Sequence, residues 1–383
     1  MTLTKLFREF FDSEQAGGIL ILCCAVFSLI VTNSPLHLAY SQLWNVHFAG
    51  HSIQGWINDA LMALFFLLIG LELEREIYVG ELSSLRSAAL PVTAAVGGMA
   101  LPALIYGIAT LGQPTFAGAG IPTATDIAFS IAILSLLGSR VPTAAKVFLT
   151  AVAIADDLGS ILIIALFYGQ SLSGVYLLLT AATFGALLVM NRLGVARLLP
   201  YLAGGGALWF FMQSSGIHPT LSGVLLAFAI PFGNGDEKSP SYVLQHFLHK
   251  PVALLVLPLF ALANTCVILE NDWFQSLRTN HSLGIIAALI FGKPLGILLA
   301  SFLGVFSGFC QLPEGMRWPH IAGLGSLAGI GFTMSILITL LAFADNPALI
   351  AECKIAILVG SLLSGSVGFL ILKVTPPLSR GEP

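Results

Sequence analysis

The sequence predicts an all-α polytopic membrane protein with twelve transmembrane helices arranged as inverted repeats. Two of these helices, the fourth and the eleventh, are expected to be interrupted and to cross at mid-membrane. Three observations lead to this fold class: the composition, the succession of long apolar runs, and the uneven distribution of basic residues between alternate loops.

The composition places the chain in a membrane. Of its 383 residues, 57% are hydrophobic and 9% are charged, whereas roughly 25% are charged in soluble domains. The mean hydropathy is +0.93. The net charge of −3 argues against a nucleic-acid partner. The five cysteines have no Cys-x-x-Cys spacing, so we interpret them as small apolar residues rather than a disulfide framework or a metal site.

Apolar runs long enough to cross a bilayer recur along the whole chain. The first, at about 14–32, lacks an Ala-x-Ala cleavage site, so we expect a retained span rather than a signal peptide. The preceding residues 1–11 carry an apolar face typical of an interfacial helix. The remaining spans are predicted at about 56–78, 88–110, 114–138, 143–168, 171–190, 197–212, 217–231, 250–269, 282–304, 320–345 and 348–373.

A polar segment separates the first two spans. Polar and apolar residues alternate on both sides of Ala49-Gly50, which predicts a small hairpin at about 45–55 outside the membrane. Its expected role is contact with a second subunit in a homodimer, although it can equally be a connector.

The basic residues test the number of spans. With the N-terminus inside, only Arg278 and Lys354 lie outside, and Lys293 lies within a span. The inside loops and tails carry Lys5, Arg8, Arg75, Arg86, Arg140, Lys146, Arg192, Arg197, Lys238, Lys250, Arg317, Lys373 and Arg380. This bias fits twelve spans with both termini cytoplasmic.

Glycine interrupts two of the predicted spans. Gly118, Gly120 and Pro122 fall inside the fourth span, and Gly329 and Gly331 fall inside the eleventh. Each interrupted span is followed by one ordinary long span, and the fourth and eleventh enter the membrane from opposite sides.

The interruptions therefore occupy corresponding places in two units of opposite orientation, about 88–168 and 282–373. We expect both units to belong to a single transporter domain over 1–383. Inverted repeats with broken helices are typical of secondary transporters, which place their site where the broken helices meet.

Four ionisable residues fall at membrane depth: Asp126, Asp156, Asp157 and Lys293. A charge at this depth is costly and usually functional. Asp156 and Asp157 are adjacent, so they point about 100° apart around their helix. Lys293 can neutralise one aspartate and a helix N-terminus can offset another. The third must bind a proton or a cation.

A buried carboxylate that holds either a proton or a hard cation can exchange one for the other. Oxygen ligands suit Na⁺ or Li⁺, and Thr125 or unwound backbone carbonyls can complete the shell. No thiolate or histidine cluster points to a transition metal, because most of the histidines are expected in loops. No Walker motif points to ATP. We therefore expect a transporter without a cofactor, and not an enzyme.

Three other functions stay open at this point. A symporter for an organic solute would need more polar or aromatic recognition groups than these spans carry. An intramembrane aspartyl protease would need a Gly-x-Gly-Asp motif and two facing aspartates, whereas Asp156 and Asp157 share one helix. A channel would need a ring of charged or carbonyl groups.

Six motifs, in order over nearly the whole chain, resemble the bacterial NhaA sodium/proton antiporters. They are residues 56–66, 70–72, 125–129, 155–159, 292–296 and 329–335. That family is itself a known example of inverted repeats, so the repeat inference is not independent of the resemblance.

The resemblance implies a role for each matching residue. Asp157 would be the main cation ligand, and Asp156 would take part in proton exchange and pair with Lys293. Asp126 and Thr125 would lie where the broken helices cross, with Asp126 balancing helix N-termini and Lys293 balancing C-termini. The implied transport is electrogenic, with more protons entering than Na⁺ ions leaving.

The resemblance also implies regulation by pH. Glu72 and Glu76 match a cluster of ionisable residues at the cytoplasmic side, and His218 matches a histidine linked to the pH response. The same acidic stretch could equally be a solvated loop edge. Two residues depart from the family pattern: Gln245 replaces a common acid, and Glu74 stands where a basic residue is familiar. Both departures concern the pH profile rather than the transport chemistry.

Overall fold

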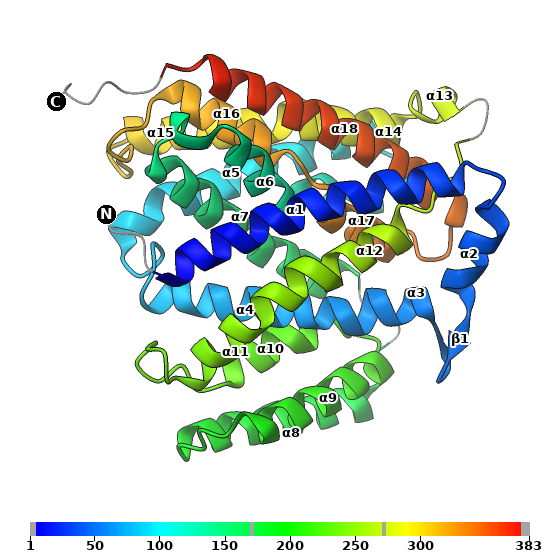
Figure 1. Cartoon of the computed structure of the whole chain (residues 1–383), viewed down its shortest axis with the longest axis vertical. Helices are drawn as coiled ribbons and strands as arrows, with labels where there is room; N and C mark the ends of the chain where they lie inside the picture. Colours follow the sequence, from blue (N-terminus) through cyan, green and yellow to red (C-terminus); the bar gives the residue numbers. More distant parts are fainter. Residues whose placement is uncertain (1–4, 169–171, 270–272, 377–383) are drawn as a thin grey trace. The chain divides into compact units, whose positions relative to one another are not determined.

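The computed structural model describes residues 5–168, 172–269 and 273–376, and for residues 5–15 and 139 only the backbone. Most of these residues lie in helices, and the described part of the chain has one sheet, a two-stranded hairpin (Figure 1). The predicted all-helical class is confirmed for this part of the chain. Residues 1–4 of the predicted interfacial helix and Arg380 of the cytoplasmic tail lie outside it.

The chain divides into two compact units that interleave in sequence. Unit 1 takes the described residues of Met1–Ser13, Cys23–Ser83 and Ile161–Cys266, and unit 2 those of Glu14–Leu22, Ser84–Ser160 and Val267–Pro383. Two helices contribute to both units, α1 (Lys5–Thr32) and α7 (Thr143–Phe167). Since α1 is continuous, the interfacial stretch and the first span form one helix.

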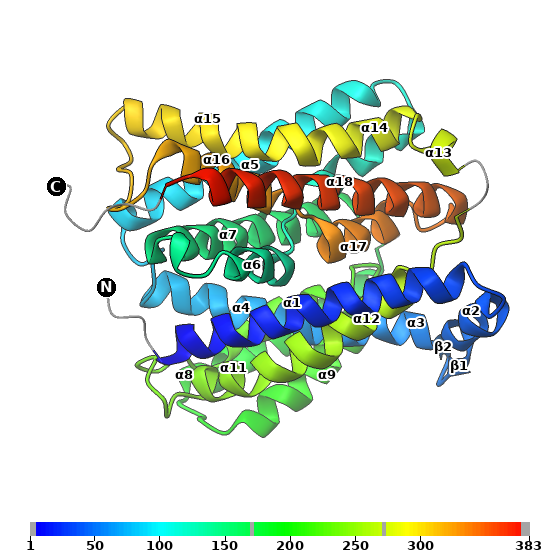
Figure 2. The ribbon, with the colours of Figure 1, turned by 45° about the horizontal axis from the view of Figure 1, so that its top comes forward.

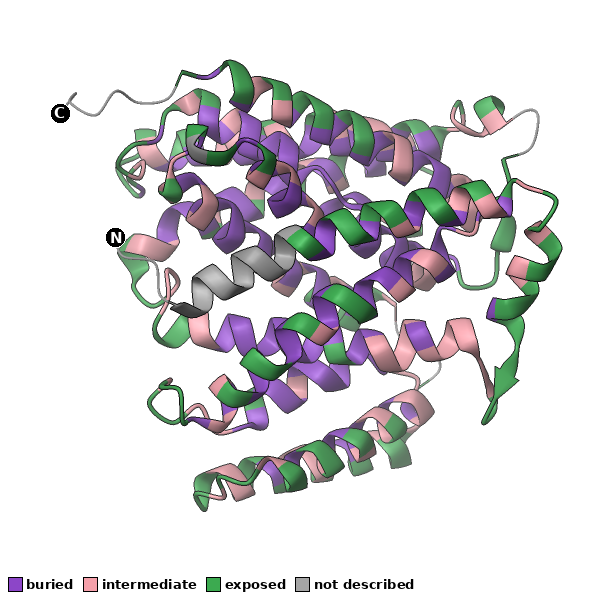
Figure 3. Cartoon of the chain, in the orientation of Figure 1, coloured by how far each residue is buried: buried purple, intermediate pink, exposed green. Residues whose placement is uncertain are grey.

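Unit 1 is built around closely packed helices. A Cβ atom on Gly223 of α10 would lie 2.1 Å from the Ala63 carbonyl oxygen of α4, so these helices meet at backbone distance. Figure 3 shows buried residues along α4 and α10, whereas α8 is mostly exposed and α9 is a mixture of buried, half-buried and exposed residues. The elements are α2 (His37–Asn45), α3 (Ile53–Trp56), η1 (Ile57–Leu61), α4 (Met62–Tyr78), α8 (Gly174–Arg192), α9 (Leu198–Ser215), α10 (Leu221–Ala229), α11 (Pro240–Pro251), η4 (Val252–Val256) and α12 (Leu257–Asn264).

The predicted hairpin is present in unit 1. Strands β1 (His47–Phe48) and β2 (His51–Ser52) pair antiparallel across Ala49 and Gly50. Both turn residues have positive φ, 48° and 87°, as a tight hairpin turn requires. The part that this hairpin plays in a dimer stays a prediction.

Unit 2 holds both interrupted spans. Figure 2 shows α5, α15, α16 and α18 running side by side. Gly97 of α5 and Gly296 of α15 let two backbones meet, because a Cβ atom on Gly296 would lie 2.2 Å from the Gly97 carbonyl oxygen. The elements are α5 (Leu85–Ala109), η2 (Pro114–Thr123), α6 (Ile127–Leu136), η3 (Gly138–Arg140), α13 (Trp273–Ser276), α14 (Asn280–Ala287), η5 (Ala288–Gly292), α15 (Lys293–Phe306), α16 (Trp318–Ala328), α17 (Phe332–Ala342) and α18 (Pro347–Val374).

The number of spans is supported in part. Seven helices in the described residues are long and apolar enough to cross a membrane, or up to ten if each of three bent helix pairs is one span. A total of twelve spans would also require α9, with 18 residues, and α10, with 9 residues. Neither helix is among the seven helices or the three bent pairs. The count of twelve stays a prediction.

Proline accounts for two π-helical turns that the sequence analysis did not predict. The turns η4 and η5 each end two residues before a proline, Pro258 and Pro294 respectively. A proline ring clashes with the carbonyl four residues earlier in an α-helix. The wider π turn moves that carbonyl aside. In η5 the amide of Lys293 donates to Ala288, five residues back.

Candidate functional site

Both interruptions predicted from glycine are present in unit 2. The η2–α6 pair bends by 44° around residues 124–126, and the α16–α17 pair bends by 46° around residues 329–331. In each break the backbone leaves the helical hydrogen-bond pattern. Its amides and carbonyls become available to other partners.

The two breaks bind each other through buried hydrogen bonds. The Asp126 amide donates to the Ile330 carbonyl at 2.7 Å. The Ser335 hydroxyl donates to the Ile121 carbonyl at 2.7 Å. The hydroxyl of Ser130 on α6 donates to a carbonyl near the end of α16 at 2.9 Å. Polar backbone groups that would be costly in an apolar medium are satisfied in this way.

Asp126 joins the N-termini of α6 and α17. Its Oδ1 accepts from the Phe129 amide at 3.0 Å and caps α6. Its Oδ2 accepts from the Thr333 amide at 3.1 Å and from the Thr333 hydroxyl at 2.6 Å. A carboxylate at two helix N-termini is favourably placed in both dipoles. The Asp126 carboxylate therefore links the N-termini of α6 and α17.

Lys293 pairs with one of the two adjacent aspartates. Its Nζ lies 2.6 Å from Oδ2 of Asp156, and both side chains are fully buried. The ammonium also donates to the Thr123 carbonyl at the end of η2. The Thr125 hydroxyl lies 2.8 Å from the same Asp156 oxygen and 2.9 Å from the Ala328 carbonyl. These contacts bring Thr125, Asp156, Lys293 and the ends of both broken helices into one cluster.

Asp157 follows on α7, where its side chain is fully buried. The hydroxyls of Thr150 and Ser160 on the same helix are buried and have no hydrogen-bond partner among the described residues. Thr150 lies seven residues before Asp157 and Ser160 three residues after it, so all three share one helix face. Neither hydroxyl was predicted from the sequence, although this spacing could have revealed both. Together they offer only oxygen atoms, which suit a hard cation.

Comparison with known proteins identifies the family. The sequence model of the family described as Na⁺/H⁺ antiporter 1 matches residues 8–372. The chain belongs to this family. It is similar to the Na⁺/H⁺ antiporter NhaA of Dechloromonas aromatica (57% identity, 97% of this chain and 96% of the relative). It is also similar to that of Flavobacterium psychrophilum (54% identity, 97% of both).

The solved structure of the sodium proton antiporter MjNhaP1 from Methanocaldococcus jannaschii at pH 8 shares the fold, with a TM-score of 0.55. It covers 96% of this chain and 100% of that chain at 15% identity, so this likeness concerns the fold alone. The family relatives are secondary transporters. This member of the Na⁺/H⁺ antiporter 1 family is therefore a transporter and not an enzyme.

In this member of the Na⁺/H⁺ antiporter 1 family, the three residues expected to respond to pH lie in unit 1 but not together. Glu72 is buried, and its Oε1 lies 3.5 Å from Nδ1 of His249. Glu76 accepts a hydrogen bond from the Glu81 amide at 2.8 Å. His218 lies beside Asp59, with 3.7 Å between Nε2 and Oδ1.

Asp59 and Glu72 are 13 residues apart on one helical run, Ile53–Tyr78, or ~20 Å along its axis. His218 and Glu72 therefore belong to separate neighbourhoods. The acidic stretch is not a solvated loop edge, because Glu72 and Glu74 are buried within α4. The two departures from the family pattern are also buried, and Glu74 accepts from the Ser241 hydroxyl at 3.5 Å.

The expectation that most histidines lie in loops is wrong. His37 lies in α2, His246 and His249 in α11, His281 in α14 and His320 in α16. The error concealed the approach of His249 to Glu72. The helix α11 begins at Pro240, ten residues before the predicted start of that span, because proline is favourable in the first turn of a helix.

Proposed function

We propose that the chain exchanges cytoplasmic Na⁺ or Li⁺ for external H⁺ by electrogenic alternating access in a bacterial inner membrane, and so maintains sodium and pH homeostasis. The observation that carries this proposal is the buried Asp156–Lys293 pair next to Asp157. The pair is electrically balanced. The next residue on the helix brings a further carboxylate into the same buried region.

Asp157 is the main cation ligand in this scheme. A carboxylate in a low-dielectric site must be neutralised by a proton or a cation, because a bare charge is costly there. Both ligands compete for the same oxygens. Asp156 releases and takes up protons while Lys293 remains its counter-charge, and the Thr125 hydroxyl, 2.8 Å from Asp156, orients that carboxylate.

Asp126 and Lys293 keep the broken helices in place. Asp126 balances the N-termini of α6 and α17, and Lys293 balances the C-terminal end of η2 through the Thr123 carbonyl. We place the two breaks at mid-membrane, in a twelve-span fold of two inverted repeats with both termini cytoplasmic. The protein works as a homodimer without a cofactor. Glu72, Glu76 and His218 set its response to pH.

Transport is tested by the pH gradient across everted membrane vesicles. Addition of Na⁺ or Li⁺, but not K⁺, should dissipate an imposed gradient, and the response should grow from slightly acidic to alkaline pH. No response to any of the three ions would move the function to another solute.

The Asp157→Asn variant separates the site from the fold. It should abolish exchange while the protein remains folded in the membrane, because an amide neither carries the charge nor releases the proton. Asp345→Asn is the matched control, since Asp345 is exposed in the loop before α18. Normal exchange by Asp157→Asn would refute this assignment.

A further inference from the structure

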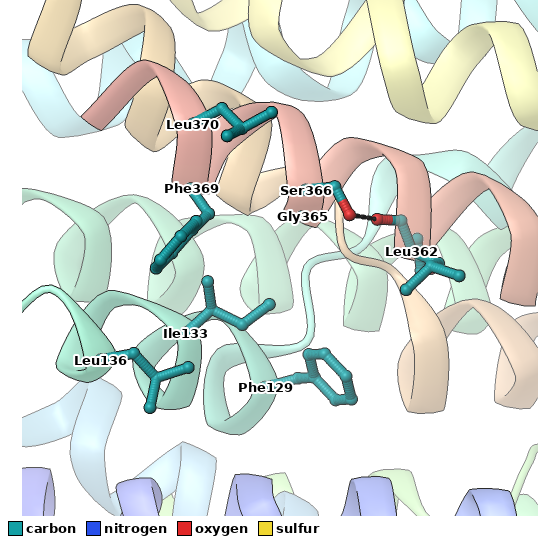
Figure 4. A pocket seen from close by; sticks show the side chains of 9 residues that line it. Phe129, Ile133, Leu136, Leu362, Gly365, Ser366, Phe369 and Leu370 are labelled. Carbon is teal, nitrogen blue, oxygen red and sulfur yellow. Dashed lines mark hydrogen bonds between the residues drawn. The ribbon is translucent and has the colours of Figure 1, made fainter. Parts of the chain in front are cut away.

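An apolar groove of about 400 Å³ lies between α6 and α18 in unit 2. Figure 4 shows side chains of Phe129, Ile133 and Leu136 on α6 facing those of Leu362 and Phe369 on α18. Neither the candidate ion site nor the breaks use these apolar surfaces. Such a groove on a membrane-spanning unit fits an apolar chain rather than a polar solute.

The polar groups in the groove are already satisfied. The Ser366 hydroxyl donates to the Leu362 carbonyl of its own helix at 2.7 Å. The Ser361 hydroxyl accepts from the amides of Gly331 and Phe332, each at 3.2 Å. No hydroxyl lining the groove therefore requires a polar ligand atom. The occupant must be apolar along this length.

One end of the groove carries positive charge. Arg140 follows α6 and donates from its guanidinium to the Lys373 carbonyl at 3.3 Å, so the ends of η3 and α18 are neighbours. The Lys373 ammonium lies 5.8 Å from the ring centre of Phe369, which lines the groove. Both basic side chains are exposed. They present two positive charges where the apolar lining ends.

The other end of the groove lies at the interrupted helices. The Phe129 ring is 5.8 Å from the Phe332 ring of α17. From Ser361 to Leu370 the groove follows α18 for ~14 Å. Half the hydrocarbon thickness of a bilayer is ~15 Å. An acyl chain anchored at the basic end would therefore reach the middle of the membrane beside the two breaks.

We propose that this groove binds one anionic phospholipid, with its phosphate on Arg140 and Lys373 and one acyl chain between α6 and α18. In the proposed topology this lipid belongs to the cytoplasmic leaflet, where anionic lipids attract basic side chains. The chain end contacts Phe129, whose amide is held by the Asp126 carboxylate. The lipid thus rests against the joint between the broken helices.

Lipid binding is measured by native mass spectrometry of the purified protein titrated with dioleoyl phosphatidylglycerol or dioleoyl phosphatidylcholine. The first phosphatidylglycerol should bind about tenfold more tightly than phosphatidylcholine. Arg140→Gln with Lys373→Gln should weaken phosphatidylglycerol binding by about tenfold and so remove this preference. The matched control is Arg192→Gln with Lys238→Gln, which removes two exposed basic residues of unit 1 and should leave the preference intact.

The acyl-chain half of the site has its own test. Ser366→Phe fills the groove and should weaken binding of both lipids by about tenfold. Val367→Phe adds the same ring on α18 to a side chain that does not line the groove, so it should change little. A phosphatidylglycerol with a photoreactive group near its acyl terminus should crosslink wild-type protein to peptides containing Phe129 or Ser361.

Two results would overturn the proposal. One is equal binding of the two lipids by the wild-type protein, with crosslinks confined to other helices. The other is an unchanged lipid affinity of Ser366→Phe together with a loss of dimer, which would assign the groove to a second copy of the chain. The wild-type measurements decide the question even if a variant fails to fold.

Discussion

At the scale of single residues, the buried aspartates of unit 2 differ in the partners that hold them. The Asp126 carboxylate accepts from three donors, two of them backbone amides. The Asp156 carboxylate shares one oxygen between an ammonium and a hydroxyl, and its Oδ1 has no hydrogen-bond partner among the described residues. Asp126 is thus fixed by the backbone, whereas Asp156 depends on side chains that can be replaced.

Replacement of Lys293 by methionine should destabilise the protein by about 3–5 kcal/mol, because Asp156 would lose its counter-charge. The double variant Lys293→Met with Asp156→Leu should recover most of this loss, since a buried ion pair replaced by apolar residues is often neutral. Chemical unfolding in detergent measures both. Lys238→Met, at an exposed position, is the control, and equal stability of the single and double variants would contradict the pairing.

Thr333→Val should destabilise the protein by about 1–3 kcal/mol, because the hydroxyl that donates to Asp126 at 2.6 Å is lost in a buried place. Thr339→Val removes a hydroxyl on the same helix that donates only to the carbonyl of its own preceding turn, Ser335. Its effect should be below 1 kcal/mol. The difference between the two unfolding free energies is the measurement, and no difference would mean that Asp126 does not need this donor.

The charged members of the candidate site could be predicted because a charged residue inside an apolar run can be recognised from the sequence alone. It could pair Lys293 with Asp156 only through the family resemblance. It could not find the Thr123 carbonyl as a second acceptor, which lies 170 residues from Lys293. Contacts of backbone groups across such separations depend on tertiary packing, which no local pattern encodes.

At the scale of elements, glycine and proline identify irregular helices with different clarity. Paired glycines predicted both breaks in unit 2. The π-helical turn η5 is indicated in the sequence only by one proline, Pro294, which follows Lys293. Its consequence reaches beyond the turn, because the carbonyl of Leu289 lies 3.0 Å from the Ser364 hydroxyl of α18. The same hydroxyl lies 2.8 Å from the Ser326 carbonyl of α16.

Pro294→Ala should lower the exchange rate and also the stability, because it moves Lys293 away from its partner Asp156. Removal of the ring allows η5 to become α-helical, which would turn Lys293 away from Asp156 by up to ~100°. Pro258→Ala gives the same backbone relief after η4 in unit 1, and should affect exchange less. Vesicle exchange and thermal unfolding are measured for both variants; wild-type exchange by Pro294→Ala would show that η5 does not position Lys293.

At the scale of the whole molecule, the composition predicted the class, and the basic residues predicted an orientation that stays a prediction. The structure adds the lengths of the helices. In the part of the chain that it describes, seven helices are long enough to be spans by themselves, and three bent pairs would raise this number to at most ten. Periodicity could not predict that α10 has only nine residues. The apolar run continues beyond α10 on both sides. The helix is shorter than the run because Pro219 and Pro231 flank it and limit its length.

Orientation is tested by labelling single cysteines. The natural cysteines are all free thiols, so they can be replaced first: Cys23, Cys24, Cys266, Cys310 and Cys353. An impermeant maleimide added to intact cells should label Gln275→Cys, outside in the twelve-span topology, and not Glu237→Cys, inside. Permeabilised cells should label both, since both positions are exposed. The reverse pattern would invert the topology.

The bonds between the two breaks also set an order of events during synthesis. Asp126 and Thr333 are 207 residues apart, so at about 5–20 residues per second the ribosome needs about 10–40 s to deliver the partner. Until then the Asp126 amide and the Ile121 carbonyl of the first break lack the partners that they have in the folded protein. The first break therefore obtains these partners only after most of the last quarter of the chain has been made.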